Sequence, residues 1–428
     1  MNKKNYVAVA TLAFAMLTSC AGQKEAKSTS GIDLANMDTT VSAGTDFFRY
    51  ACGGWNDAHP LTAEYSRYGT FDELFENSQK QLRELIEGLA AQKNNQAGSA
   101  AQKIGDLYNM AMDSVTLNKQ GAEPVKAMLD KIAGLKDKSE IVPMMTEMAH
   151  IGIGTYFHSY VYADPKNSSL NIFQMGQGGI NLGEKEYYLD TDSITQNIRE
   201  QYKLYIGKLF QLAGFSEADA QQKVADVMEI ETAIAKVSRS ATELRDPEAN
   251  YHKMSFDELK KTIAGIDWDA YMKGLGIQAP AELNVEQVEP IQEVARLMNT
   301  LPLSKHVSYL EYNLLDAAAS CLSDDFVAAR FDFYGKVLSG RQVNQPRWKH
   351  AVNSVNGMLG ELVGEMYVEK YFPAAAKERM VKLVKNLQTA LGERIDAQEW
   401  MSDSTKIRAH EKLAAFHVKV GYPDKWKD

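Results

Sequence analysis

The sequence predicts a mainly α-helical fold, a multi-helix lobe with a small β-hairpin insertion. Apolar residues recur at i, i+3, i+4 and i+7 over most of the chain after residue 70, which is the spacing of buried helix faces. One stretch, residues 155–175, breaks this rhythm with aromatic and β-branched residues on both sides of a turn. At 428 residues and 45% hydrophobic, the chain has enough apolar surface for one large or two ordinary domains.

The chain opens with the features of an exported lipoprotein. Two lysines precede the apolar run YVAVATLAFAML, which has the length of a signal-peptide core and is too short to span a bilayer. LTSC at 17–20 resembles the lipobox of bacterial lipoproteins, whose cysteine carries the lipid. We therefore expect a lipoprotein signal peptide at 1–19, lipidation of Cys20, and a lipidated flexible tether at 20–43. This predicts an outer-membrane lipoprotein of the bacterial cell envelope, on its periplasmic or surface face. An ordinary secretory signal that contains a cysteine is the alternative.

Helical stripes follow the tether in order. The first is expected to be one buried helix face and consists of Phe71, Leu74, Phe75, Ser78, Leu82, Leu85, Ile86 and Leu89. Similar stripes predict helices at 99–115, 194–213, 216–237, 285–300, 304–321, 324–338, 346–371 and 374–398. Pro373 separates the last two, as proline at a helix start does.

Residues 155–175, TYFHSYVYADPKNSSLNIFQM, are the exception. The runs on both sides of Asp-Pro-Lys-Asn at 164–167 are rich in β-branched and aromatic residues, and these four residues favour a turn. We expect a β-hairpin here.

The last motif, HEKLAAFH at 410–417, resembles a zinc site but has the wrong spacing. A zinc peptidase motif, H-E-x-x-H, places two histidines on adjacent turns of one helix face. Here His410 and Glu411 are followed by Ala414, and the next histidine is His417. Seven residues of helix separate two positions by about 10.5 Å, whereas two ring nitrogens that each lie about 2.0–2.1 Å from one zinc must be much closer together. We therefore expect no metal site at this motif. His417 is also expected near the helix end, because HVKVG alternates like a short strand.

Other catalytic and binding signatures are absent from the sequence. The net charge of −9, the pI near 5.5 and the lack of a Lys/Arg block argue against a nucleic-acid partner. There is no G-x-S-x-G and no phosphate-binding loop, and the three cysteines have no C-x-x-C spacing. The histidines are scattered, so each is expected at the surface or satisfied in the core: His59, His150, His158, His252, His306, His350, His410 and His417.

Several long phrases resemble the neprilysin family of zinc metalloendopeptidases, in family order from about residue 44 to the end. They are GTDFFRYACGGW (44–55), SRYGTFDEL (66–74), the ADPKNSS hairpin, GGINLGEKEYYL (178–189), FDFYGKVLSG (331–340), PRWK (346–349), MYVEKYFP (366–373) and WMSDSTKIRAHEKLAAFHVKVGYPDKW (400–426). The resemblance implies that residues 44–428 are the family's amino-terminal helical domain, which encloses peptide substrates. In that family the zinc motif lies further downstream. The zinc cofactor is therefore expected outside this chain, and the chain alone is expected to be inactive.

The resemblance also implies one substrate-binding residue. In the family, the arginine of the SRYG motif binds the carboxy-terminal carboxylate of the substrate, and here that residue is Arg67. A planar guanidinium suits the task because it can donate two parallel hydrogen bonds to a carboxylate. The alternative is that Arg67 only pairs with a nearby acid. A second family arginine lies eight residues on, where this chain has Phe75, which puts a two-arginine grip in doubt.

The resemblance leaves the state of the chain open. It fits a fragment, a truncated gene product or one half of a split enzyme with a separate catalytic-half polypeptide; a non-catalytic peptide-binding lipoprotein is the alternative. Aromatic residues expected on a face that the other half would cover are Trp55, Trp400, Tyr422 and Trp426. In vertebrate relatives Cys52 pairs with a cysteine of the other half. Cys321 is expected to be a small core residue, and a pairing of the two remains open.

Overall fold

The structure, a computed structural model, describes residues 31–92 and 94–427. The expected signal peptide at 1–19 and the lipidation of Cys20 lie outside these residues. The chain divides into two compact units between Thr62 and Ala63. Within the described ranges, no helix combines the length and the apolarity that crossing a membrane requires.

The first unit contains the 3₁₀ turn η1 (Leu34–Asn36) and helix α2 (Phe47–Ala58). The two elements approach closely at Gly54, where a β-carbon would lie 2.2 Å from the backbone oxygen of Ala35. Only glycine fits such a contact. This explains the second glycine of the YACGGW phrase in structural terms.

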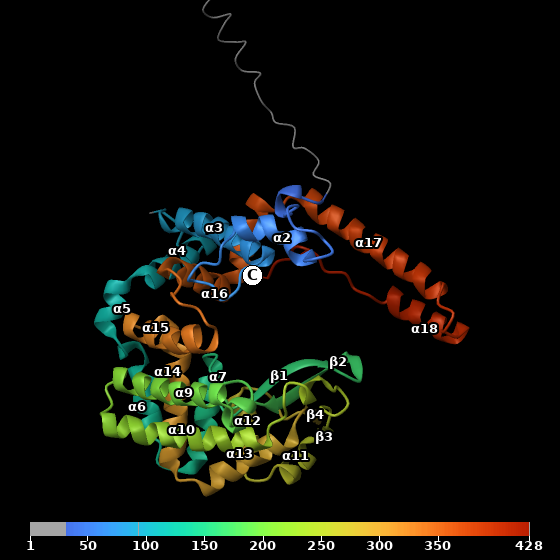
Figure 1. The fold of residues 1–428 in the computed structure, drawn as a ribbon. Helices are drawn as coiled ribbons and strands as arrows, with labels where there is room; N and C mark the ends of the chain where they lie inside the picture. Colours follow the sequence, from blue (N-terminus) through green and yellow to red (C-terminus); the bar gives the residue numbers. More distant parts are fainter. Residues whose placement is uncertain (1–30, 93, 428) are drawn as a thin grey trace, which may run out of the picture. The chain divides into compact units, whose positions relative to one another are not determined.

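The second unit is mainly helical, which confirms the predicted fold class (Figure 1). Its elements in chain order are α3 (Thr70–Ala90), α4 (Ala100–Met112), α5 (Ser114–Gln120), α6 (Glu123–Ala133), η2 (Lys138–Glu140), α7 (Ile141–His150), β1 (Phe157–Asp164), β2 (Asn167–Gln177), α8 (Glu186–Leu189), α9 (Ser193–Leu212), α10 (Glu217–Val237), η3 (Glu243–Arg245), β3 (Lys253–Ser255), α11 (Phe256–Thr262), α12 (Trp268–Gly274), β4 (Glu282–Val285), α13 (Val288–Thr300), α14 (Leu303–Ala318), η4 (Ala319–Cys321), α15 (Asp324–Arg330), the π-helical η5 (Phe331–Leu338), α16 (Arg347–Tyr371), α17 (Ala374–Asp396) and α18 (Asp403–Ala414).

The predicted hairpin is present and belongs to a larger sheet. Strands β1 and β2 pair antiparallel from Phe157 opposite Gln177, and the turn lies at 164–167 as expected. The sheet order is β1-β2-β4-β3, with β4 parallel to β2 and antiparallel to β3. The sequence did not predict β3 and β4, because strands of three and four residues are too short to show alternation. The helix expected from residue 285 begins only at Val288, since residue 285 ends β4.

The larger hydrophobic core of this unit lies among the sheet and helices α6, α7, α9, α10, α13 and α14 (Figure 1). Its largest fully buried side chains are aromatic, among them Trp268, Tyr202 and Tyr309. The hydroxyl of Tyr309 lies 3.2 Å from the backbone oxygen of Thr155 and 3.1 Å from that of Gly179. Such buried hydrogen bonds fix the position of α14 relative to the segments that contain Thr155 and Gly179.

Within this core, the carboxylate of Glu231 is fully buried and surrounded by donors. It accepts hydrogen bonds from Tyr188 Oη (2.7 Å), Tyr202 Oη (2.9 Å) and Asn181 Nδ2 (2.7 Å). The backbone N–H of Leu182 in turn donates to Tyr188 Oη at 3.0 Å. Asn181, Leu182 and Tyr188 all belong to the phrase GGINLGEKEYYL, so much of that phrase serves to hold a buried acid. Burial raises the pKa of Glu231 to about 7, although the three hydrogen bonds oppose the rise.

This pKa predicts a pH dependence of stability. The folded-state pKa, about 7, exceeds the ordinary 4.5, so the folded protein binds this proton more tightly than the unfolded chain does. The resulting stability is complete at low pH and is lost as the pH rises through 7. Relative to a Glu231→Gln variant, which cannot ionise, the wild-type chain should lose about 3 kcal/mol between pH 4.5 and 8. Urea unfolding of both proteins across this range measures the difference, and parallel curves would contradict it.

A second, smaller core joins α3, α4 and α16, which lie side by side (Figure 1). Ile86, Ile104 and Val352 are fully buried there. The expectation of one continuous buried face on α3 is wrong in its first half: Phe71 is 87% exposed, and Leu74 and Phe75 are exposed too. Periodicity identifies the apolar face of a helix, but it does not show whether the chain covers that face.

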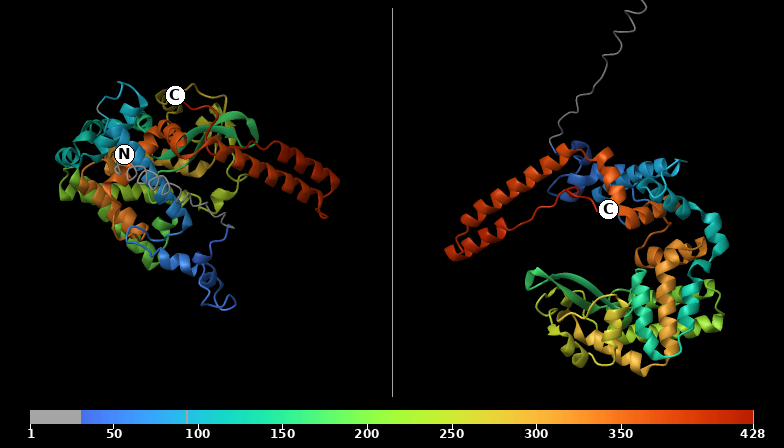
Figure 2. Two further views of the ribbon diagram at one scale, coloured as in Figure 1. Left: turned by 90° about the horizontal axis from the view of Figure 1, so that it is seen from above. Right: turned by 180° about the vertical axis from the view of Figure 1, so that it is seen from behind.

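Helices α17 and α18 form an antiparallel pair (Figure 2). Pro373 is the N-cap of α17. This agrees with the prediction that Pro373 lies at a helix start. Ile395 is the one buried residue of α17. A stripe of apolar residues at helical spacing stays exposed on it: Met380, Leu383, Leu387 and Leu391.

Candidate functional site

The structure separates the two histidines of the HEKLAAFH motif. His410 Nε2 lies 2.7 Å from Asp396 Oδ1, across the α17–α18 pair. Helix α18 ends at Ala414, so His417 lies beyond it, in a segment that forms no strand. Among the described residues, no group of three or more His, Cys, Asp or Glu side chains is arranged to hold a metal ion. The residues of this motif therefore do not fit the zinc of the family.

Arg67 lies in the loop at 63–69, immediately before α3. Its side chain is exposed, and its guanidinium forms no ion pair or hydrogen bond with any described residue. The alternative, that Arg67 pairs with a nearby acid, is therefore not observed in the described part of the chain. A guanidinium without an internal acid is available to bind an external anion.

The loop that carries Arg67 is held by a buried lysine. Lys349, on the first turn of α16, is only 5% exposed, and its ammonium group lies 3.1 Å from Glu64 Oε2 and 2.6 Å from Glu76 Oε1. The hydroxyl of Tyr65 also donates a hydrogen bond to Glu76. One cation thus ties the loop, through Glu64, to α3 and α16.

The charges of this cluster stabilise one another. Burial would lower the pKa of Lys349, but the hydrogen bonds and charges of Glu76 and Glu64 outweigh it and raise this pKa. Burial would raise the pKa of Glu76, but Lys349 and Tyr65 outweigh it and lower this pKa. Lys349 and Glu76 are therefore both ionised at neutral pH.

Backbone contacts hold both ends of the loop. The N–H groups of Gln342 and Val343 donate to the carbonyl oxygen of Ala63 at 2.9 and 3.0 Å. At the other end, the N–H of Gly69 donates to Asp72 Oδ2 at 2.9 Å and so caps α3. The backbone on each side of Arg67 is therefore fixed, and the site is preorganised.

The first two turns of α3, which follow Arg67, carry exposed apolar side chains beside the acids Asp72 and Glu73. Phe71, Leu74 and Phe75 are exposed on the first two turns of the helix. Phe75 stands where the resemblance places a second arginine, so the first turns of α3 supply no second guanidinium. The site offers one cation beside an apolar surface.

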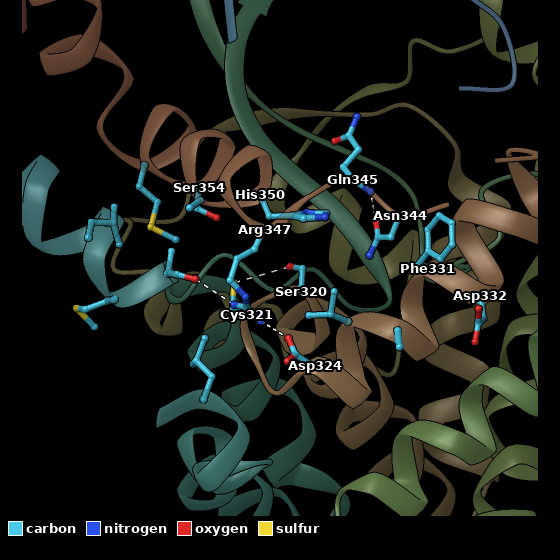
Figure 3. Close-up of a pocket in the computed structure, with 18 of the residues that line it drawn as sticks. Ser320, Cys321, Asp324, Phe331, Asp332, Asn344, Gln345, Arg347, His350 and Ser354 are labelled. Atoms are coloured by element: carbon cyan, nitrogen blue, oxygen red, sulfur yellow. Dashed lines mark hydrogen bonds and ion pairs between the residues drawn. The ribbon is translucent and has the colours of Figure 1, made fainter. Parts of the chain in front are cut away.

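A cavity of about 550 Å³ lies among α4, α5, α15, η5 and α16 (Figure 3). Its walls include Leu107, Phe331 and Met358. The charged groups in it are already paired: Arg347 donates to the carbonyl oxygen of Ala111 at 3.0 Å and to Asp324. The cavity is therefore mainly apolar, and the charges of Arg347 and Asp324 are already compensated within the protein.

Cys321 also lines this cavity, which corrects the expectation that it is a core residue. Its side chain is exposed, because the helix expected at 304–321 ends at Ala318 and the last three residues form the turn η4. Cys52 is partly buried, and both cysteines are free thiols.

Among the aromatic residues expected on an uncovered face, only Trp400 is strongly exposed, at 75%. Tyr422 and Trp426 are partly buried and stack on each other with ring centroids 6.2 Å apart. Trp55 is partly buried and stacks on His59 at 4.4 Å. Exposed apolar side chains also lie on α3 and α17.

Lys349 is the residue of the site that sequence reasoning missed. It ends the phrase PRWK, which was recognised only as part of the resemblance. Its acidic partner Glu76 is 273 residues away. No local pattern connects two residues so far apart, so a lysine within a helical stripe gave no signal of its role.

The comparisons with known proteins agree on one family. The sequence profile of peptidase family M13 matches residues 43–423. Endothelin-converting enzyme 1 of Rattus norvegicus is 29% identical over 409 residues, covering 91% of this chain and 52% of that protein. Membrane metallo-endopeptidase-like 1 of Homo sapiens is 26% identical over 420 residues, covering 91% of this chain and 53% of that protein. The chain spans about half the length of these relatives.

A solved structure shares the fold. The zinc metalloprotease ZMP1 of Mycobacterium tuberculosis, in complex with an inhibitor, superposes with a TM-score of 0.86 at 32% identity, covering 93% of this chain and 60% of that one. The helical fold, the hairpin and the profile match, which extends over most of the sequence, lead to the same assignment. This chain belongs to peptidase family M13, the neprilysin family of zinc metalloendopeptidases.

Proposed function

We propose that this chain is the substrate-enclosing lobe of a neprilysin-like zinc metalloendopeptidase, and that it binds the carboxyl terminus of peptides through Arg67. The observation that carries the proposal is the exposed guanidinium of Arg67, which has no partner among the described residues, on a loop fixed by the buried Lys349. Because the loop that carries the guanidinium is already fixed, binding avoids the entropic cost of ordering the loop. The zinc chemistry of the family is assigned to residues outside this sequence.

The exposed apolar surfaces support a partner for this lobe. Phe71, Leu74 and Phe75 on α3, and the stripe from Met380 to Leu391 on α17, expose more apolar surface than scattered single residues do. We propose that a zinc-bearing catalytic half covers them.

The carboxylate contact predicts a matched loss of affinity. Replacing Arg67 by alanine should weaken binding of a peptide with a free carboxyl terminus by roughly tenfold to a hundredfold, because a charge-assisted hydrogen bond is lost. Amidating the peptide should weaken binding to the wild-type chain by a similar factor, and should have little further effect on the variant. Fluorescence anisotropy measures all four combinations.

Two controls accompany this experiment. Arg67→Lys keeps the charge but loses the planar fork, so its affinity should fall between those of the wild type and Arg67→Ala. Arg408→Ala removes an exposed arginine of α18 and should leave binding unchanged. Equal affinity of the wild-type chain for the acid and the amide peptide would remove Arg67 from the site, and the chain would then lack its proposed role in carboxylate binding.

We also propose that the chain is anchored in the bacterial outer membrane through Cys20. One acyl chain gives only marginal binding, so firm anchoring requires the multiply acylated form. Cys20→Ala should move the protein from the membrane to the soluble fraction after cell breakage, as measured by immunoblot. A variant that stays with the membrane would refute the lipid anchor.

A further inference from the structure

Strand β1 forms one edge of the four-stranded sheet, since β2 pairs with its other side. An edge strand directs the N–H and C=O groups of alternate residues away from the sheet. Pairing of β1 with β2 is regular from Phe157 to Ala163, and the register shifts only between Ala163 and Asp164. The outward backbone groups are therefore evenly spaced along most of the strand.

This edge lacks the usual protection against pairing. Edge strands in proteins typically carry charges, proline or a bulge that prevent another strand from adding. The run FHSYVYA at 157–163 contains no Lys, Arg, Asp, Glu or Pro, and its irregularity lies at the end. Tyr160, Val161 and Tyr162 are exposed in succession, and neighbouring residues of a strand point to opposite faces. Apolar side chains thus flank the edge on both faces.

Side-chain hydrogen bonds also tie the strand to neighbouring elements. The Ser159 hydroxyl lies 2.8 Å from that of Tyr271 on α12, and the Tyr160 hydroxyl donates to the carboxylate of Glu286 after β4. A strand fixed in this way is ordered before any partner arrives, which lowers the cost of binding.

We propose that β1 binds an extended peptide as an added strand, with aliphatic or aromatic side chains on both faces. This inference rests on the proposed peptide-binding function and adds a second contact to it, made to the peptide backbone. Evenly spaced backbone donors and acceptors match another polypeptide strand. A second copy of this chain is the less suitable occupant, because each copy carries a net charge of −9 and two copies repel each other.

The backbone contact is tested with a fluorescein-labelled nine-residue peptide of alternating Val and Tyr with a free carboxyl terminus, which carries aliphatic side chains on one face and aromatic side chains on the other. A strand has two hydrogen-bonding edges, so a peptide N-methylated at alternate residues can still pair through its other edge. Its dissociation constant should change by about threefold or less. N-methylation at every residue removes both edges and should weaken binding more than about tenfold, since several hydrogen bonds are lost.

Matched variants locate the contact. Val161→Lys/Tyr162→Lys places two charges on the exposed edge and should weaken binding more than about tenfold. Ile194→Lys/Leu204→Lys makes the same change on α9, where both side chains are also exposed, and should change binding less than about twofold; Tyr162 and Leu204 are 68% and 65% exposed. Thermal melts confirm that both double variants are folded.

The outcomes separate this inference from the proposed function. Binding that depends on Arg67 but not on N-methylation or on the β1 variant overturns the added strand and leaves the carboxylate site intact. Binding that depends on β1 but not on Arg67 supports the added strand and refutes the carboxylate site. Dimers that the β1 variant dissociates, with peptide affinity unchanged, would make a second copy the occupant. No binding to the wild-type chain at millimolar peptide overturns the inference as well.

Discussion

Replacing Glu231 by alanine is expected to lower the free energy of unfolding by about 3–5 kcal/mol. The change leaves the hydroxyls of Tyr188 and Tyr202 and the amide of Asn181 without their common acceptor, in a region that water does not reach. It also opens a cavity where the side chain was. Urea unfolding at pH 5, where the wild-type carboxyl is largely protonated, measures the loss without a contribution from a buried charge.

The matched control for this variant is Glu229→Ala, two residues earlier on α10. Glu229 is exposed and pairs with Lys305 at the surface, where ion pairs contribute little to stability. A small effect at Glu229 and a large one at Glu231 would assign the loss to the buried hydrogen bonds. Equal effects would show that the donors around Glu231 find other partners.

Replacing Lys349 by alanine should lower the free energy of unfolding by about 3 kcal/mol, because removing one partner of a buried ion pair leaves the other without compensation. The acids left behind are Glu64 and Glu76. The same change should weaken binding of peptides with a free carboxyl terminus, since the loop that carries Arg67 loses its anchor. Chemical unfolding and the acid and amide peptides measure the two effects.

Lys370→Ala is the control on the same pair of helices. Lys370 pairs with Glu84 across α16 and α3, as Lys349 pairs with Glu76, but both of its groups are exposed. Its removal should change neither stability nor peptide affinity measurably. If Lys349→Ala keeps the wild-type preference for acid over amide peptides, Lys349 stabilises the fold without positioning Arg67.

The fold class and most of the long helices could be predicted from the sequence, because both depend on local periodicity. The hairpin at 164–167 was predicted for the same reason. Helices α6, α7, α11 and α12 were not predicted. The features that could not be predicted depend on contacts between residues far apart in the sequence, or on whether another element covers an apolar helix face. On α3, the first half of the predicted apolar face from Phe71 to Leu89 is exposed. Cys321 lies on the surface because its helix ends three residues earlier than predicted.

The site follows the same division. Arg67 was found through a short phrase that resembles a family motif, whereas the lysine that fixes its loop was not. Glu231 gave no signal either, since the tyrosines that surround it lie 43 and 29 residues before it. Side chains that meet only after folding leave no periodic pattern, and their pairing depends on the tertiary structure.

The smaller core has a consequence for synthesis on the ribosome. Its helices α3 and α4 are complete by Met112, but their partner α16 begins only at Arg347, and Gln79 must find Asn353 across 274 residues. At about 5–20 residues per second, the two helices wait roughly ten to fifty seconds for that partner. Meanwhile all elements of the larger core emerge and can collapse around one another. The larger core therefore forms first, and the loop with Arg67 is ordered among the last parts. Until then, Ile86 and Ile104 are shielded from water only by chaperones or by each other.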